Sequence, residues 1–334
     1  MDLKRCDGES KDNATEACTR PKMADLLKCY VWEGQQLRKS SRLAAFAKER
    51  NTVLLMSDSS WVQRHRKLLG FMIPMLFFQF LWWSLAVRHS LFQLFPERYL
   101  MTITMIFGSL VAGMTSEGGG AVAFPVMTLA MSISPSVARD FSLMIQSCGM
   151  TAAAFTILWM RIQLEWRSIC GCSFGAVFGF VFGAHWLDQR LSPAEKKMGF
   201  VSVWASFAVA LFLLNHHHRR RSACQPVDTI RHWRWWKAVV LLATGFCGGC
   251  FTSICGSGVD ICSFSVLTLL FQVSEKVATP TSVVLMAVNT LFGFYWRQLI
   301  QTPDGVSLEA WQYLAVCVPV VVVFAPLGSL IASH

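Results

Sequence analysis

The sequence predicts an all-α protein that crosses a membrane several times, built from two inverted-topology repeats and one extra N-terminal transmembrane helix. Three observations predict this fold class. Of the 334 residues, 54% are hydrophobic and only 15% are charged, whereas about 25% are charged in an ordinary soluble domain. Apolar runs of about 20 residues recur, each long enough to cross ~30 Å of hydrocarbon. Two longer apolar runs are interrupted midway by glycines, at corresponding places in the two halves.

The chain begins with a basic extension, residues 1–67, which we expect on the cytoplasmic side. Apolar and basic side chains alternate at roughly helical spacing over residues 23–50, which is typical of an amphipathic helix on the membrane surface. A flexible tail is the alternative. The first long apolar run follows, and residues 68–92 therefore hold the extra transmembrane helix.

Repeat one comprises residues 99–214. Its first segment is too long for a single crossing and is interrupted by Gly118, Gly119 and Gly120. We therefore expect two helices, either re-entrant or broken, that meet at these glycines, and we name this place break one. Three transmembrane spans follow, near residues 141–160, 168–187 and 198–214.

A basic loop, residues 215–237, separates repeat one from repeat two, residues 238–334. Repeat two has the same construction, with Gly256 and Gly258 at its interruption, which we name break two. These two glycines match Gly118 and Gly120 at an offset of 138, which indicates an internal duplication. Spans near residues 277–296 and 310–332 follow, but no counterpart of residues 198–214 does, so we expect repeat two to lack its last helix.

The distribution of basic residues predicts the orientation of the repeats. The N-terminal extension and the loop of residues 215–237 are both rich in Lys and Arg and should both be cytoplasmic. Four single spans lie between them, so the segment that contains break one must contribute an even number of crossings. Repeat one then starts on the outer side and repeat two on the inner side.

The two breaks are candidate anion sites. Backbone N–H groups at a helix break lack intrahelical partners, and glycine lets a ligand approach the backbone closely. The alternative is that these glycines only permit tight packing of helices. The predicted substrate-binding residues are Ser116, Gly118, Gly119, Gly120, Ser253, Gly256, Ser257, Gly258 and Asn289.

Ionisable residues in apolar surroundings are expensive and usually functional. Glu117 is the candidate coupling residue, because a carboxyl beside a bound anion would take up a proton. Asp260, two residues beyond Gly258, is predicted to cap the following helix or to handle an ion. Arg139 and Asp140 follow Pro135 at a helix start, where we expect an exposed interfacial pair.

Other function classes are disfavoured. The net charge of +10 lies mainly outside the apolar runs, which favours a topological role for the basic residues over nucleic-acid binding. Most of the twelve cysteines lie inside apolar runs, as small packing residues would, and we predict neither a metal site nor a cofactor. No nucleophile with its base converges on one membrane face, so we do not expect an enzyme.

Residues 116–126, SEGGGAVAFPV, together with residues 249–258, GCFTSICGSG, resemble the duplicated glycine motifs of the sulfite exporter TauE/SafE family. The resemblance implies an all-helical permease that moves sulfite, organosulfonates or related small carboxylates. We therefore expect a secondary transporter of small anions in a lipid bilayer, with protons as the candidate coupling ion and an oligomer as a candidate assembly. An anion channel, or a non-transporting scaffold or shortened isoform, is the alternative.

Overall fold

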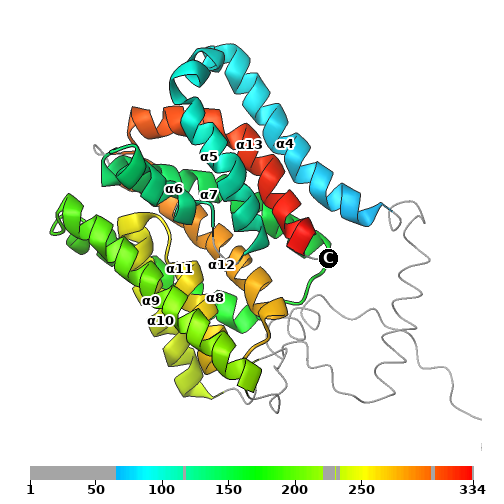
Figure 1. Ribbon diagram of the computed structural model, residues 1–334, viewed down its shortest axis with the longest axis vertical. Helices are drawn as coiled ribbons and strands as arrows, with labels where there is room; N and C mark the ends of the chain where they lie inside the picture. The colour runs from blue at the N-terminus through cyan, green and yellow to red at the C-terminus, as the bar shows by residue number, and fades with distance from the viewer. Residues whose placement is uncertain (1–64, 116–117, 221–229, 231–233, 302–304, 333–334) are drawn as a thin grey trace, which may run out of the picture.

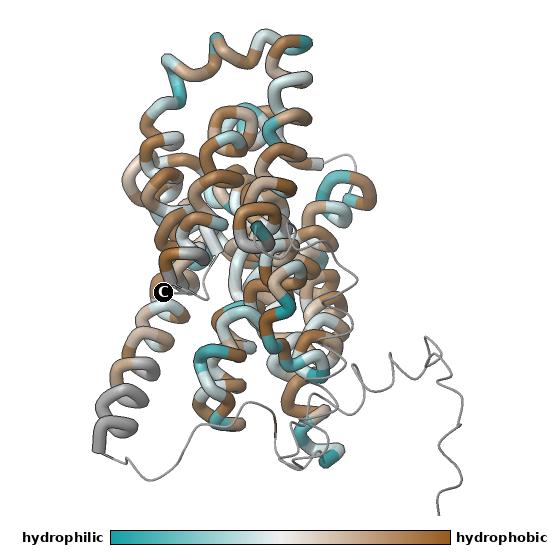
Figure 2. Tube along the Cα trace, turned by 90° about the vertical axis from the view of Figure 1, so that its right-hand side faces the viewer, coloured by the Kyte–Doolittle hydropathy of each residue, from teal (hydrophilic) through white to brown (hydrophobic). Residues whose placement is uncertain are grey.

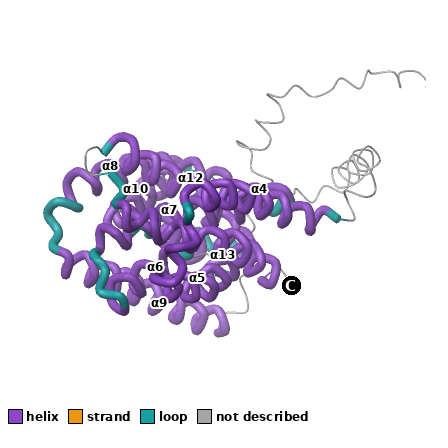
Figure 3. The backbone as a smooth tube through the Cα atoms, turned by 90° about the horizontal axis from the view of Figure 1, so that it is seen from above, coloured by secondary structure: helices purple, strands orange, loops and turns teal. Residues whose placement is uncertain are grey.

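The computed structural model describes residues 65–115, 118–220, 230, 234–301 and 305–332. Nearly all of the predicted N-terminal extension, including its amphipathic helix, lies outside these ranges. Within them the regular structure is helical, and no β-strand is present (Figure 3). The long helices, in chain order, are α4 (Arg66–His89), α5 (Phe95–Met114), α7 (Pro135–Trp159), α8 (Trp166–Phe182), α9 (Pro193–Arg220), α10 (Trp235–Cys255), α12 (Glu275–Tyr295) and α13 (Leu308–Ala332). The short helices are α6 (Gly120–Pro125) and α11 (Val259–Ser265), with a 3-10 turn at Leu91–Leu94 between α4 and α5.

Six stretches of helix in the described part of the chain are long and apolar enough to cross a membrane, and Figure 2 shows the hydrophobic residues along these helices. They are Leu68–His89, Pro135–Trp159, Trp166–Arg190, Trp235–Cys255, Glu275–Ile300 and Leu308–Gly328. The apolar spans predicted within residues 68–92 and near residues 141–160, 168–187, 277–296 and 310–332 are thus confirmed as apolar helices. The run predicted at residues 198–214 is helical, as part of α9, but is not among these six. The chain is an integral, multi-pass membrane protein.

Helices α7 and α12 form the centre of the molecule (Figure 1). In the most apolar 18 residues of each span, 78% are buried for α7 and 72% for α12. The corresponding value for α4 is 17%, and the large apolar side chains of α4 are mostly exposed. In a membrane such exposed apolar side chains face lipid. Around the central pair, α5 packs against α13 on one side and α8 packs against α10 on the other.

Each of the two glycine breaks is followed by the same succession of elements. The short helices α6 and α11 each run into a π-helical turn, at Val126–Ala130 and Val266–Leu270. The chain then becomes extended at Ser134 and at Ser274, with φ of −61° at both and ψ of 140° and 142°. A long central helix, α7 or α12, begins directly after each of these serines. The same order of local structures therefore follows both breaks, in agreement with the internal duplication that the sequence predicts.

Candidate functional site at the two helix breaks

Break two contains a backbone conformation that favours glycine. Helix α10 ends at Gly256, whose φ is +80°, in the left-handed region. A Cβ at this position would lie 2.7 Å from the Cβ of Ser142 and 2.7 Å from the carbonyl oxygen of Arg139. Both of these residues belong to α7, so the glycine lets break two approach the central helix closely.

Break one contacts both central helices. A Cβ on Gly120 would lie 1.4 Å from Nε2 of Gln146, on α7, so the amide of Gln146 occupies the space that glycine leaves open. A Cβ on Gly118 would lie 2.4 Å from Cε of Met286, on α12. A shift of 140 residues superposes Ser134 on Ser274 and therefore Gln146 on Met286, so corresponding positions of the two repeats present a polar and an apolar side chain to the same break.

Asp260 connects the two breaks. It lies in the first turn of α11 and is fully buried, with 0% of its surface exposed. Its carboxylate accepts a hydrogen bond from the hydroxyl of Ser257 in break two, at 3.3 Å, and another from the backbone N–H of Gly118 in break one, at 3.4 Å. Segments 142 residues apart in the sequence thus meet at one carboxylate.

Two side chains of α7 bring unpaired polar atoms to this meeting point. Ser142 and Gln146 are 0% and 1% exposed, and within the described residues neither the Ser142 hydroxyl nor either amide atom of Gln146 has a hydrogen-bond partner. Leaving such a buried group unpaired costs about 1–3 kcal/mol. Both side chains lie against the breaks, because Ser142 contacts Gly256 and Gln146 contacts Gly118 and Gly120. A ligand with several acceptor oxygens would satisfy these donors.

Neither Ser142 nor Gln146 is among the site residues predicted from the sequence. Gln146 lies within a long apolar run, where a single amide among apolar neighbours does not by itself indicate a binding site. The available signal was the spacing of four residues from Ser142, which puts the two polar side chains on one face of the same helix.

Two other predicted site residues, Ser253 and Asn289, lie near the breaks and have hydrogen-bond partners within the protein. Ser253 donates to the carbonyl of Cys250 at 2.7 Å, and its side chain contacts Gly183 at the end of α8. Asn289 donates to the hydroxyl of Ser173, at 3.2 Å, which ties α12 to α8. Asn289 also lines a narrow crevice together with Thr252 and Val259, the residues on either side of break two.

The remaining glycines of the breaks differ in how crowded they are. Gly119 begins the turn into α6, and a Cβ there would meet only the tip of Met105, at 3.3 Å. Gly258 precedes α11, and a Cβ there would lie 2.6 Å from Cβ of Phe251. Ser116 and Glu117 lie outside the described residues, so the roles predicted for them stay predictions.

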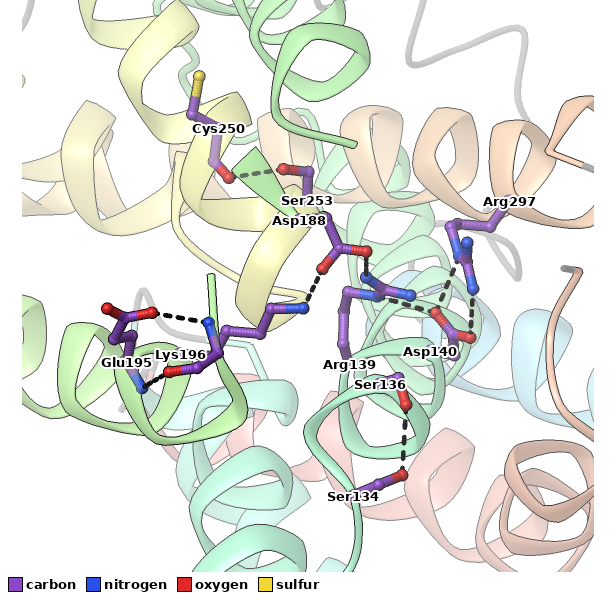
Figure 4. A network of polar contacts seen from close by, with 11 residues as sticks. Ser134, Ser136, Arg139, Asp140, Asp188, Glu195, Lys196, Cys250, Ser253 and Arg297 are labelled. Carbon is purple, nitrogen blue, oxygen red and sulfur yellow. Dashed lines mark hydrogen bonds and ion pairs between the residues drawn. The ribbon is translucent and has the colours of Figure 1, made fainter. Parts of the chain in front are cut away.

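The expectation that Arg139 and Asp140 form an exposed interfacial pair is wrong. They are 3% and 2% exposed and belong to a buried network of charges (Figure 4). Arg297, in the turn after α12, donates to both oxygens of Asp140, at 3.0 and 2.8 Å. Arg139 donates to Asp140 and to Asp188, at 3.0 and 2.5 Å, and Lys196 donates to Asp188 at 2.6 Å. Three cations and two carboxylates from four helical segments are thereby paired, with one net positive charge left over. This pairing offsets much of the cost of burying Arg139, Asp140 and Arg297.

Comparisons with known proteins agree with the arrangement described above. A family model described as "Sulfite exporter TauE/SafE" matches residues 100–334, which include both breaks, both central helices and the buried charge network. No curated protein and no solved structure matches the chain significantly. Because the family match covers well over half of the chain, the protein belongs to the sulfite exporter TauE/SafE family.

Proposed function

We propose that this protein is a secondary transporter of small anions of the sulfite and organosulfonate class, and that the anion binds where the two helix breaks meet. The observation that carries the proposal is the pair of buried side chains with unpaired polar atoms, Ser142 and Gln146, which lie directly against both breaks. Their hydroxyl and amide groups are neutral donors of the kind that recognise sulfonate and sulfite oxygens. The family match supports the same substrate class.

The burial of this site favours a carrier over a channel. The donors of Ser142 and Gln146 and the carboxylate of Asp260 are closed off from solvent, whereas a channel needs a continuous water path past its selective groups. A carrier alternates between states that open the site to one side or to the other. The predicted inverted repeats would supply two such states through exchange of the conformations of the two halves.

The proposal is tested with the purified full chain in proteoliposomes. Uptake of 35S-labelled sulfite and methanesulfonate is expected, with sulfate as a competitor. External unlabelled anion should accelerate the exit of labelled anion, which a channel would not show. Absence of flux of both labelled anions would reject the proposed function, and flux without counterflow would favour the channel.

A variant of Gln146 tests the site itself. Gln146→Leu removes a hydrogen bond to a charged ligand, worth about 1.5–3 kcal/mol, and should raise the substrate concentration for half-maximal flux about 10- to 150-fold. The matched control is Gln93→Leu, because Gln93 is exposed in the 3-10 turn between α4 and α5, away from the breaks. Equal substrate dependence in both variants would place the anion elsewhere.

A further inference from the structure

Asp260 differs from the other buried aspartate of the centre in its partners. Asp140 is 2% exposed and is bonded by Arg139 and Arg297. Asp260 is 0% exposed, and its hydrogen bonds come from neutral donors: the Ser257 hydroxyl at 3.3 Å, the Gly118 N–H at 3.4 Å, and the backbone N–H groups of Ile261 and of Asp260 itself. A buried ionised carboxylate needs a cation or strong hydrogen bonds to compensate its lost hydration.

None of the described segments brings a Lys, Arg or His side chain to Asp260. Asp260 interacts electrostatically with the thiol of Cys262 on the same helix, and Cys262 interacts in turn with Cys247 of α10 and Cys172 of α8. The faces that α7 and α12 turn toward the breaks carry Gln146 and Met286, which do not titrate. Asp260 is not a member of the charge network of Figure 4 or of the pair between Arg98 and Glu309, although Arg139 and Lys196 of that network act electrostatically on Cys255, next to break two.

The unpaired donors place the bound anion close to this carboxylate. Gly118 donates its N–H to Asp260, and a Cβ on Gly118 would lie 3.0 Å from the amide carbon of Gln146, beyond the closer Met286. An anion held by Gln146 and Ser142 would therefore be separated from Asp260 by little more than the backbone of Gly118. Two negative charges in one buried site repel each other strongly, because little solvent screens them.

We propose that Asp260 is the proton-binding site of the carrier and that it moves one proton with each anion. The proposal rests on the proposed function of the two breaks as an anion site. The carboxylate takes up one proton as the anion enters, its carboxyl group stays neutral while the site is closed, and the same proton leaves with the anion on the other side. Transport of a monovalent anion is then electroneutral, and transport of doubly charged sulfite moves one net negative charge.

The test follows proton and anion movement in the same proteoliposomes. Inward flux of labelled methanesulfonate through the wild-type chain should acidify a pH dye trapped in the lumen. Asp260→Asn keeps an acceptor for Ser257 and for the Gly118 N–H but cannot ionise. It should retain anion exchange, with a rate independent of pH, and lose both the acidification and the stimulation by a pH gradient. Glu275→Gln, an exposed carboxylate at the start of α12, is the matched control and should behave as the wild type.

The outcomes separate this inference from the proposed function. If the wild type moves neither sulfite nor methanesulfonate, the proposed function itself is rejected. If the wild type moves anions but Asp260→Asn still acidifies the lumen, or folds and no longer exchanges anion, the proton role of Asp260 is overturned. If Asp260→Asn does not fold, Asp260→Glu decides: proton flux with a shifted pH midpoint supports the proposal, and an unchanged midpoint rejects it.

Discussion

At Gly120 the side chain of one helix fills the space left free by another. The amide of Gln146 lies where a Cβ on Gly120 would have to be, whereas the neighbouring Gly119 faces only the flexible tip of Met105. The two adjacent glycines therefore have different tolerances to substitution, although the sequence presents them as equivalent members of one run.

Gly120→Ala is expected to destabilise the protein and to impair transport, because the added methyl group forces Gln146 out of its position. Overpacking of this kind costs about 1–3 kcal/mol, which should lower the melting temperature by several degrees. Gly119→Ala is the matched control and should leave melting nearly unchanged. Adding Gln146→Ala to Gly120→Ala should restore stability without restoring anion affinity. Equal melting temperatures for the two single glycine variants would contradict the assigned contact.

A buried carboxyl in the loop between α7 and α8, that of Glu165, makes stability depend on pH. Glu165 is 3% exposed and accepts a hydrogen bond from the backbone N–H of Ile230, at 3.4 Å. Burial raises the pKa of Glu165 above its ordinary value, and the N–H of Ile230 only partly opposes this. The folded state therefore binds this proton more tightly than the unfolded state does. The stabilisation is complete below the unfolded pKa and is lost as the pH rises through the folded pKa.

Glu165→Gln should consequently melt at a higher temperature than the wild type at neutral pH and at nearly the same temperature at pH 4. The amide keeps an acceptor for Ile230 but carries no charge to be buried. Thermal unfolding in detergent between pH 4 and 8 measures the difference, and Glu275→Gln, at an exposed position, should show no such trend. A difference between Glu165→Gln and wild type that shrinks with rising pH would refute this reasoning.

The sequence predicts well those helices that can be recognised from their own residues, without knowledge of what they pack against. The two breaks were predictable because glycines interrupt apolar runs too long for one crossing, and the long spans because about 20 apolar residues suffice to identify each. The charge network was not predictable in this way. Its partners are separated by 49 residues, for Arg139 and Asp188, and by 157 residues, for Asp140 and Arg297, so only the packing of four helical segments brings them together. The interfacial prediction for Arg139 and Asp140 failed because it considered only their own helix.

The network should respond to substitution as a coupled unit. Asp140→Asn removes the carboxylate that Arg297 binds with two hydrogen bonds, while Arg139 retains Asp188. Breaking a buried pair costs about 3–5 kcal/mol, because one charge is left uncompensated. Adding Arg297→Gln should recover part of that loss, and a double-mutant cycle of thermal stability measures the coupling. Additive effects of the two substitutions would show that the contact contributes nothing.

Over the whole molecule, the contacts between the two central helices bear on the relative orientation of the repeats. Asp140, near the start of α7, contacts Arg297, just after the end of α12. At the other end of this pair, Glu165, between the end of α7 and the start of α8, donates its backbone N–H to the hydroxyl of Thr281, near the start of α12, at 3.0 Å. The two central helices, α7 and α12, therefore run antiparallel. This geometry supports the inverted orientation that the distribution of basic residues predicts.

Inverted orientation makes a definite prediction about which loops share a side of the membrane. With the basic N-terminal extension and residues 215–237 in the cytoplasm, the turn after α8 and the start of α13 should face outward. The turn after α7 and the start of α12 should face inward.

The side of the membrane on which each loop lies is measured with single cysteines in a background without native cysteines, treated with a membrane-impermeant maleimide. Gln189→Cys and Leu308→Cys should react in intact cells, whereas Ile162→Cys and Glu275→Cys should react only after permeabilisation. All four residues are exposed, so a missing reaction reports the membrane and not burial in the protein. Labelling of Gln189→Cys and Glu275→Cys from the same side would be incompatible with the repeats having opposite orientations.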